Sequence, residues 1–242
     1  MRVANGVHVL PIPRGPREPE SFLNPTLIID EDNGHTLVDA GLPDQADAIN
    51  AALAGAGIGV PDLRRIIFTH QDVDHIGSGA ALVRQSGARV MAHSADAPYI
   101  DGSLRPLKPS PEMLEQRPHM RELLKRLEPV GVDEQVESDS HLDLAGGTRV
   151  IFTPGHTPGH ISLYVERLKV LIAGDALTAH GGYLNSPNPS LTLDMHTAIR
   201  SIRRLADLDI DTIICYHGGV VSEDANGQLR RVLQEATSES RE

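Results

Sequence analysis

Short apolar runs, each about as long as a β-strand, recur along the chain and end in polar or turn-forming residues. These runs cover residues 36–39, 66–69, 148–152, 170–173 and 211–215. Between them, residues 46–56 and 198–208 carry apolar side chains at helical spacing and predict amphipathic helices. Strands that alternate with helices favour an α/β architecture built from packed layers.

The run at residues 66–69 leads directly into a dense group of polar side chains. Its members are His70, Asp72, Asp74 and His75. Charged groups packed this closely repel one another and lose solvation, so a folded chain usually keeps such a group to hold a cation. Imidazole mixed with carboxylate favours zinc, iron or manganese over calcium and magnesium, which prefer oxygen ligands. The alternative is a solvated loop that is rich in histidine.

Three other apolar runs also end beside a residue of the type that binds metal. The residues that follow these strands are His156, Asp175 and His217. Four strand ends of this kind, in order along the chain, predict a metal centre to which all of them contribute. His160 lies four residues after His156, and we interpret it as a hydrogen-bonded turn residue rather than a ligand.

The order of these residues resembles that of the metallo-β-lactamase-fold superfamily. The signature of that family is H-x-H-x-D-H, followed by a distant histidine, a bridging aspartate and a final histidine. The matching residues are His70, Asp74, His75, His156, Asp175 and His217. An upstream Asp-x-Gly also matches at Asp39 and Gly41, where the family's aspartate supports the site without binding metal. One position departs from the signature, because Asp72 replaces the second motif histidine.

The resemblance implies a four-layer αββα sandwich with the site at one edge of its two sheets. It also implies two divalent metal ions, zinc first, with manganese or iron as alternatives. The expected ligands are His70, Asp72 and His156 for the first metal, Asp74, His75 and His217 for the second, and Asp175 for both. Direct binding by Asp72 would shift the first site from zinc towards manganese or iron. If the Asp72 side chain does not reach the first metal, that metal keeps fewer ligands. In either case, the first site should bind zinc more weakly than the second.

These ligands predict a metal-dependent hydrolase. Two metals would share a water and lower its pKa towards neutrality, which supplies a metal-bound hydroxide. Asp74 would face this nucleophile and carry a proton to the leaving group. Tyr183 would donate a hydrogen bond to a developing oxyanion, and the alternative for this residue is packing within its loop. The expected substrate is a small molecule with an ester, lactone or thioester bond, as in lactonases and glyoxalase II.

Two other classes of function stay open on the sequence. Flavodiiron proteins of this fold carry a carboxylate at the position of Asp72, which makes an iron-dependent oxidoreductase one alternative, although the chain has no room for their flavin domain. The DNA-processing domain of competence proteins has a similar H-x-D-x-D-H, which makes a manganese-dependent nuclease or phosphodiesterase the other. A formal net charge of −11 opposes nucleic-acid binding, because such binding relies on a basic surface.

Length and composition fit one domain. A chain of 242 residues with 40% hydrophobic content can bury one substantial core, so we expect a single domain over residues 1–242. Residues 103–111 are rich in proline and basic residues, and residues 112–127 predict an amphipathic helix. By the resemblance, this insertion at about residues 103–128 shapes the substrate pocket or a dimer contact. The alternative is an ordinary surface helix.

Several features that the sequence lacks indicate the expected cellular compartment. No apolar run approaches the roughly 18 residues that span a bilayer, and the N-terminal residues show no signal-peptide core. The single cysteine, Cys215, precludes an internal disulfide, fits a reducing cytoplasm and is interpreted as a core residue. We therefore expect a cytoplasmic protein with no membrane partner and with a homodimer as the default oligomeric state.

Overall fold

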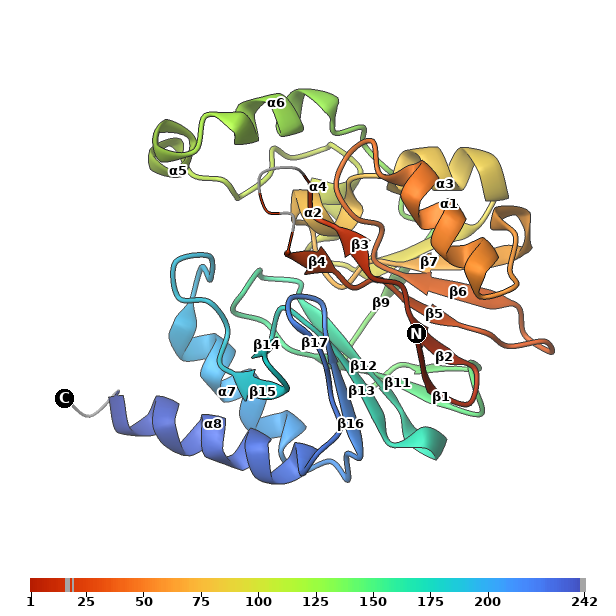
Figure 1. Ribbon diagram of the computed structural model, residues 1–242. Coiled ribbons are helices and arrows are strands. Elements are labelled where there is room, and N and C mark those ends of the chain that lie inside the picture. The colour runs from red at the N-terminus through yellow and green to blue at the C-terminus, as the bar shows by residue number, and fades with distance from the viewer. Residues whose placement is uncertain (16–17, 19, 240–242) are drawn as a thin grey trace.

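The computed structural model describes residues 1–15, 18 and 20–239, and its strands form two main sheets with helices on their outer faces (Figure 1). The first sheet has the strand order β1-β2-β5-β6-β7-β8-β9. Its strands are β1 (Arg2–Ala4), β2 (Val7–Val9), β5 (Thr26–Ile28), β6 (His35–Val38), β7 (Leu63–Ile67), β8 (Arg89–His93) and β9 (Glu134–Val136). Neighbouring strands from β6 to β9 are parallel, so their carboxyl ends lie at one edge of the sheet.

The second sheet has the strand order β10-β11-β12-β13-β16-β17. Its strands are β10 (His141–Leu142), β11 (Thr148–Phe152), β12 (Ile161–Val165), β13 (Val170–Gly174), β16 (Thr212–Cys215) and β17 (Gly219–Val221). Strands β13 and β16 are parallel, and both end beside predicted ligands. Two small hairpins lie outside these sheets: β3 (Ile12–Pro13) with β4 (Phe22–Leu23), and β14 (Thr178–His180) with β15 (Tyr183–Asn185).

Helices cover the outer face of each sheet. The helices are α1 (Ala46–Gly55), α2 (Val73–Ile76), α3 (Gly79–Ser86), α4 (Ala97–Ile100), α5 (Pro111–Gln116), α6 (His119–Arg126), α7 (Met195–Leu205) and α8 (Ala225–Glu239), with 3₁₀ turns η1 (Val60–Asp62) and η2 (Glu166–Leu168). Helices α1 and α3 lie over the first sheet, and α7 and α8 lie over the second (Figure 1). Within the described ranges, no helix has both the length and the apolar character that crossing a bilayer requires.

Three clusters of buried side chains form the core between these layers. Helix α1 packs on the first sheet in a cluster that contains Ile49 and Ile66. The next residue on the strand, Ile67, points to the other face and packs with Leu163 between the two sheets. The third cluster joins the second sheet to α7 and α8 and includes Ile202. The expected four-layer αββα sandwich is therefore confirmed.

The single helix predicted over residues 112–127 is wrong, because the structure has two short helices there, α5 and α6. Pro118 lies between them. Proline has no backbone N–H, and it disfavours helical geometry at Arg117, whose φ of −129° and ψ of 69° are non-helical. No residue of α5 or α6 is fully buried, so the apolar side chains of the insertion stay partly exposed.

The other two predicted helices are present with shifted ends. Helix α1 ends at Gly55, one residue before the predicted range ends. Helix α7 begins at Met195 rather than at residue 198, because the Asp194 side chain accepts a hydrogen bond from the backbone N–H of Thr197 (2.9 Å) and caps the first turn.

Candidate metal centre

Strand β7 and the short helix α2 place four of the predicted ligands on one loop. His70 and His75 are fully buried, and their ring centroids are 3.9 Å apart. Asp72 and Asp74 lie further out and keep part of their side chains in contact with solvent. The loop therefore directs two imidazoles inward and two carboxylates towards the surface.

A buried carboxylate beyond strand β6 fixes the orientation of one of these rings. Asp39 Oδ2 lies 2.9 Å from His75 Nδ1, and Asp39 Oδ1 accepts a hydrogen bond from the backbone N–H of Thr69 (2.8 Å). A carboxylate only accepts hydrogen bonds, so Nδ1 of His75 donates, and Nε2 is the ring nitrogen directed at the other predicted ligands. The supporting contact expected for Asp39 is confirmed.

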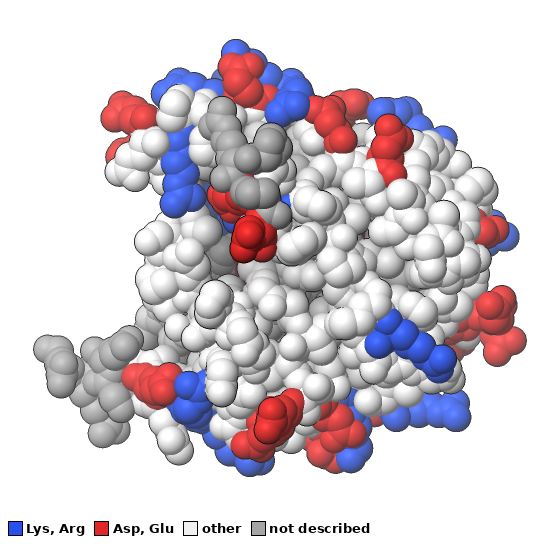
Figure 2. Space-filling view, in the orientation of Figure 1, with Lys and Arg blue, Asp and Glu red and all other residues white. Residues whose placement is uncertain are grey.

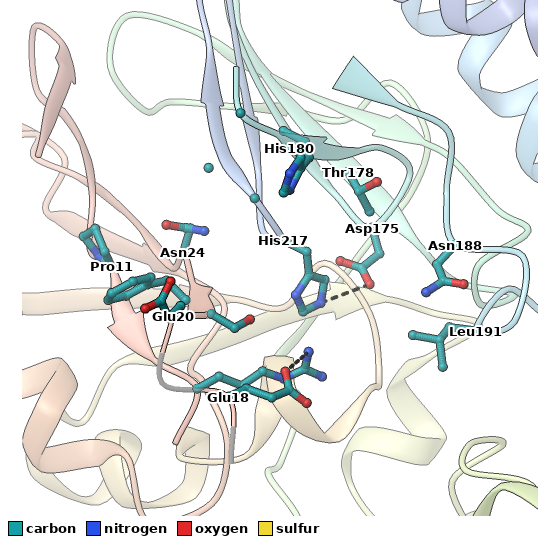
Figure 3. Close-up of a pocket in the computed structure, with 17 residues that line it drawn as sticks. Pro11, Glu18, Glu20, Asn24, Asp175, Thr178, His180, Asn188, Leu191 and His217 are labelled. Carbon is teal, nitrogen blue, oxygen red and sulfur yellow. Dashed lines mark hydrogen bonds and ion pairs between the residues drawn. The ribbon is translucent and has the colours of Figure 1, made fainter. Parts of the chain in front are cut away.

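Asp175 lies at the middle of the cluster and contacts three histidines from other elements. Its Oδ1 is 3.3 Å from His75 Nε2. Its Oδ2 is 3.3 Å from His156 Nε2 and 3.4 Å from His217 Nε2. The same His217 nitrogen is 3.4 Å from Asp74 Oδ2, and Figure 3 shows His217 and Asp175 facing one another. The structure thus brings together side chains that are distant in the sequence.

The donor atoms form two groups, in each of which all the atoms lie within 4.8 Å of one another. The groups are His70, His156 and Asp175, and Asp74, His75 and His217. Four buried atoms of the cluster have no hydrogen-bond partner within the described part of the chain: His70 Nε2, Asp72 Oδ1, His75 Nε2 and Asp175 Oδ1. Both of these nitrogens lie 3.3–3.4 Å from a carboxylate oxygen, but without the geometry of a hydrogen bond. Because unpartnered buried polar atoms are costly, this donor set fits a bound divalent cation.

The environment shifts the pKa values of these groups in different directions. Burial alone raises the pKa of Asp175, but the imidazoles around it, His217 first, hold that pKa well below its usual range. Burial lowers the pKa of His75, whereas the carboxylates of Asp39 and Asp175 raise it well above the usual value. Burial dominates at His70 and holds its pKa well below the usual value, so this ring is neutral at pH 7, the form that binds metal.

An open cavity of about 850 Å³ leads to the cluster (Figure 3). Asp175 and His217 line it, together with polar and apolar side chains from the hairpins and loops around it. Glu18 and Glu20 also line the cavity, and Figure 2 shows acidic side chains beside a hollow between the two halves. A cavity of this size suits a small organic molecule.

Tyr216 is a buried residue that the sequence analysis did not select. Its hydroxyl donates to the backbone oxygen of Asp74 (2.5 Å) and accepts from the backbone N–H of Gly41 (3.2 Å). Its ring lies against His75, with centroids 3.8 Å apart. The tyrosine therefore holds the part of the loop that carries Asp74 and His75. The sequence signal that could have identified Tyr216 is its position directly before His217, just beyond a predicted strand.

Asp96 connects the loop of His70–His75, called here the first ligand loop, to the loop of His156. Its carboxylate accepts hydrogen bonds from the backbone N–H of Gln71 (3.0 Å), the Thr157 hydroxyl (2.7 Å) and the backbone N–H of Gly159 (2.7 Å). No local pattern marks Asp96 in the sequence, since all three partners come from other segments. One carboxylate thus connects two loops that carry predicted ligands.

His160 also supports the centre. Its Nε2 accepts a hydrogen bond from the backbone N–H of Asp175 (2.9 Å), and its Nδ1 lies 2.8 Å from the Thr153 hydroxyl. Burial lowers the pKa of His160 to about 3, so the ring is neutral. The interpretation of His160 as a hydrogen-bonded residue agrees with these contacts. At Gly174, a Cβ atom would lie 2.7 Å from this ring, so the strand end requires glycine.

Lys108 is the least expected residue of the centre. Its Nζ lies 2.6 Å from Asp72 Oδ2 and 2.8 Å from His156 Nε2, and it donates to the backbone oxygen of Leu191 (2.7 Å). Burial raises the pKa of Asp72, but the Lys108 ammonium holds that pKa well below its usual range. The basic character of residues 103–111 was evident in the sequence, but nothing local distinguishes Lys108 within it.

Tyr183 lies apart from the cluster. Its side chain is 66% exposed on strand β15. Among the described residues that line the cavity, its neighbours His180 and Gly181 are present and Tyr183 is not. Hydrogen bonding of Tyr183 to an oxyanion therefore stays a prediction that no contact supports. Cys215 is fully buried in the core, as expected.

Comparisons with known proteins agree with this geometry. The family model for the metallo-beta-lactamase superfamily matches residues 21–217. The probable metallo-hydrolase YflN of Bacillus subtilis is 31% identical over 244 residues, which cover 89% of this chain and 84% of the relative. A hydroxyacylglutathione hydrolase of Pseudomonas paraeruginosa is 32% identical over 209 residues, covering 81% of this chain and 65% of the relative. A metallo-beta-lactamase family protein from Thermus thermophilus has a TM-score of 0.78 at 25% identity, covering 98% of this chain and 80% of that one.

Proposed function

The chain belongs to the metallo-β-lactamase superfamily and is a metallo-hydrolase, and from this premise we propose that it hydrolyses an ester, lactone or thioester bond of a small molecule. The observation that carries the proposal is the set of unpartnered buried donor atoms beside an open cavity. These atoms are His70 Nε2, Asp72 Oδ1, His75 Nε2 and Asp175 Oδ1. The residues close enough together to hold a cation are His70, Asp74, His75, His156, Asp175 and His217. A bound divalent cation, zinc first, would polarise the scissile carbonyl and lower the pKa of a coordinated water.

Asp74 is the residue proposed to move a proton. Its Oδ2 is 3.4 Å from His217 Nε2 and 3.6 Å from Arg14 Nη2, and both of these residues line the cavity. A carboxylate in this position can take a proton at Oδ2 and release it to the leaving group. The hydrogen bond from Tyr216 to the Asp74 backbone keeps the carboxylate in place during both transfers.

The cavity supports a substrate with both polar and apolar parts. Asn24 and Asn188 offer amide groups, while Phe22 and Leu191 offer apolar surface. The hydroxyacylglutathione hydrolase relative makes a thioester the first substrate class to test, although the chain spans 65% of that protein. Within the proposed single domain, the insertion at residues 103–128 contributes Lys108 beside the centre, which supports a role in the pocket.

The test is a substrate panel with the purified protein loaded separately with zinc, manganese and iron. The panel contains thioesters of glutathione, acyl-homoserine lactones and p-nitrophenyl esters. His217→Ala should lower kcat/KM by at least about a hundredfold, because a cation-binding group at the cavity is lost. The matched control is His196→Ala, since His196 is exposed on α7 and touches Arg200 rather than the cluster. Equal activity of the wild type and His217→Ala would contradict the proposal.

The same preparation tests the two alternative classes. An iron-dependent oxidoreductase would show iron absorbance and oxygen consumption with no hydrolysis in the panel. A manganese-dependent nuclease would nick a plasmid and leave the esters intact. Either result would replace the proposed ester, lactone or thioester hydrolysis.

A further inference from the structure

We propose that Lys108 is an internal cation that takes the place of one metal ion, so that the centre holds a single resident metal. The ion would be held in the half formed by Asp74, His75, His217 and Asp175. This inference rests on the proposed metal centre and deepens it.

The contacts of Lys108 are those of a cation in a binding site. The ammonium offers three donors, and three acceptors surround it: Asp72 Oδ2 at 2.6 Å, His156 Nε2 at 2.8 Å and the Leu191 backbone oxygen at 2.7 Å. Lys108 is only 8% exposed. A buried lysine requires such compensation, because an unpaired ammonium away from water is strongly unfavourable.

The backbone beside Lys108 is hydrogen-bonded to the loop of His70–His75, and this contact positions the lysine side chain at the site. The N–H of Leu107 donates to the Gln71 side-chain oxygen (3.1 Å). Gln71 lies between two predicted ligands, and its own N–H donates to buried Asp96 (3.0 Å). These contacts place the backbone next to Lys108 beside the segment that carries Asp72.

Lys108 contacts two atoms that the first metal would need as ligands, His156 Nε2 and Asp72 Oδ2. His156 Nε2 lies 2.8 Å from Lys108 Nζ and 3.1 Å from Asp72 Oδ2. Because an ammonium only donates hydrogen bonds, we assign the Nε2 lone pair to Lys108. The Nδ1 of His156 then carries the proton, 3.2 Å from the Thr192 hydroxyl. With His156 Nε2 and Asp72 Oδ2 engaged, His70 Nε2 and Asp72 Oδ1 are the unpartnered donors on this side. A divalent ion there would also face the positive charge of Lys108 at close range.

Among the described residues, the cation that contacts the other half is Arg14, whose Nη2 lies 3.6 Å from Asp74 Oδ2, beyond hydrogen-bond distance, and whose side chain is 32% exposed. His75 Nε2 and Asp175 Oδ1 have no hydrogen-bond partner among the residues that the structure describes, and His217 Nε2 faces the carboxylates of Asp74 and Asp175. Three or four donors of this kind suffice for one zinc ion with a position left open. Lys108 also explains why Asp72 replaces the second motif histidine. An aspartate pairs with the lysine, whereas a neutral histidine would leave the charge of Lys108 unbalanced.

Metal stoichiometry tests the proposal without relying on activity. The wild-type protein and Lys108→Met are equilibrated with excess zinc and analysed by mass spectrometry for bound metal, and a chromophoric chelator measures each affinity. We expect one tightly bound equivalent in the wild type and two in Lys108→Met, because the affinity for a second zinc ion should rise at least about tenfold when the ammonium is removed. Lys125→Met is the matched control, because Lys125 is exposed on α6 and pairs with Glu122, and it should bind one equivalent.

A second variant covers the case in which Lys108→Met does not fold. Lys108→Gln removes the charge but can still donate to Leu191, and the same gain of a second equivalent is expected. Two equivalents of equal affinity in the wild type and in the folded variants would overturn the role of Lys108 while leaving the metal centre intact. One equivalent in every folded variant would also overturn it. A wild-type protein that binds no metal would instead contradict the proposed function itself.

Discussion

Replacement of Asp39 by asparagine isolates what the carboxylate contributes beyond its shape. In the native protein, the two oxygens of Asp39 receive hydrogen bonds from His75 Nδ1 and from the backbone N–H and hydroxyl of Thr69. The backbone conformation at this position, with φ of 63°, is one that asparagine also adopts. The substitution therefore changes the hydrogen bonding rather than the chain path.

The substitution should have two effects, one on metal affinity and one on the free energy of unfolding. The asparagine amide has one acceptor oxygen, and if Thr69 keeps it, the amide nitrogen faces His75 Nδ1. That ring nitrogen must then accept, which moves the ring proton to Nε2 and removes the lone pair that faces the centre. Loss of such a supporting partner lowers metal affinity by about 10–100-fold. The cost in folding free energy should be of similar size, about 1–3 kcal/mol for a mispaired buried group.

Competition with a chromophoric chelator measures the affinity, and urea unfolding of the metal-free protein measures the stability. Asp44→Asn is the control, because Asp44 has a similar φ of 68° but is exposed and pairs with exposed Arg126. Such a surface pair is worth about 0–1 kcal/mol, so metal affinity should not change. Wild-type metal affinity in a folded Asp39→Asn protein would refute the assigned role of the carboxylate.

Three other perturbations have defined outcomes. Burial raises the pKa of Asp30, but hydrogen bonds from the backbone of Asn33 and Ala145 hold it below its ordinary value of 3.8. The stabilisation is therefore complete above pH 3.8 and is lost as the pH falls through the lowered pKa, so urea unfolding should show Asp30→Asn about 1 kcal/mol less stable at neutral pH and the gap closing in acid. His160→Ala should lower the unfolding free energy by about 1–3 kcal/mol, because the Asp175 N–H loses its acceptor, and an unchanged calorimetric midpoint would contradict that contact. Chelation of bound metal should lower the melting temperature and added zinc should restore it in scanning fluorimetry, because a ligand of the folded state alone stabilises it; identical melting curves would argue against a metal centre.

The parts of the site that the sequence predicted are those with a local signal. His70, Asp175 and His217 lie just beyond β7, β13 and β16, because an apolar run followed by small residues marks the end of a buried strand. The layered fold followed from the same runs, and the resemblance of the ligand order refined it to four layers. The break at Pro118 was also readable locally, since proline ends a helix wherever it falls inside one.

The parts that the sequence could not predict depend on contacts between distant segments. Lys108 lies 48 residues before His156, and Asp96 lies 63 residues before Gly159. Neither residue stands at a strand end or in a recognisable spacing. Their roles arise only when the loops meet, so a pattern read along the chain contains no trace of them.

The division of the core between two sheets also sets an order of events during synthesis. The strands of the first sheet are complete once Val136 has left the ribosome, and α1 and α3 can cover their outer face at once. The inner face, with Val38 and Ile67, must wait for Leu163 and the later strands, so it stays exposed to water or to a chaperone in the meantime. A metal ion captured at this stage would meet only the donors of the first ligand loop. Loading of the complete centre is therefore a late event that follows the arrival of His217.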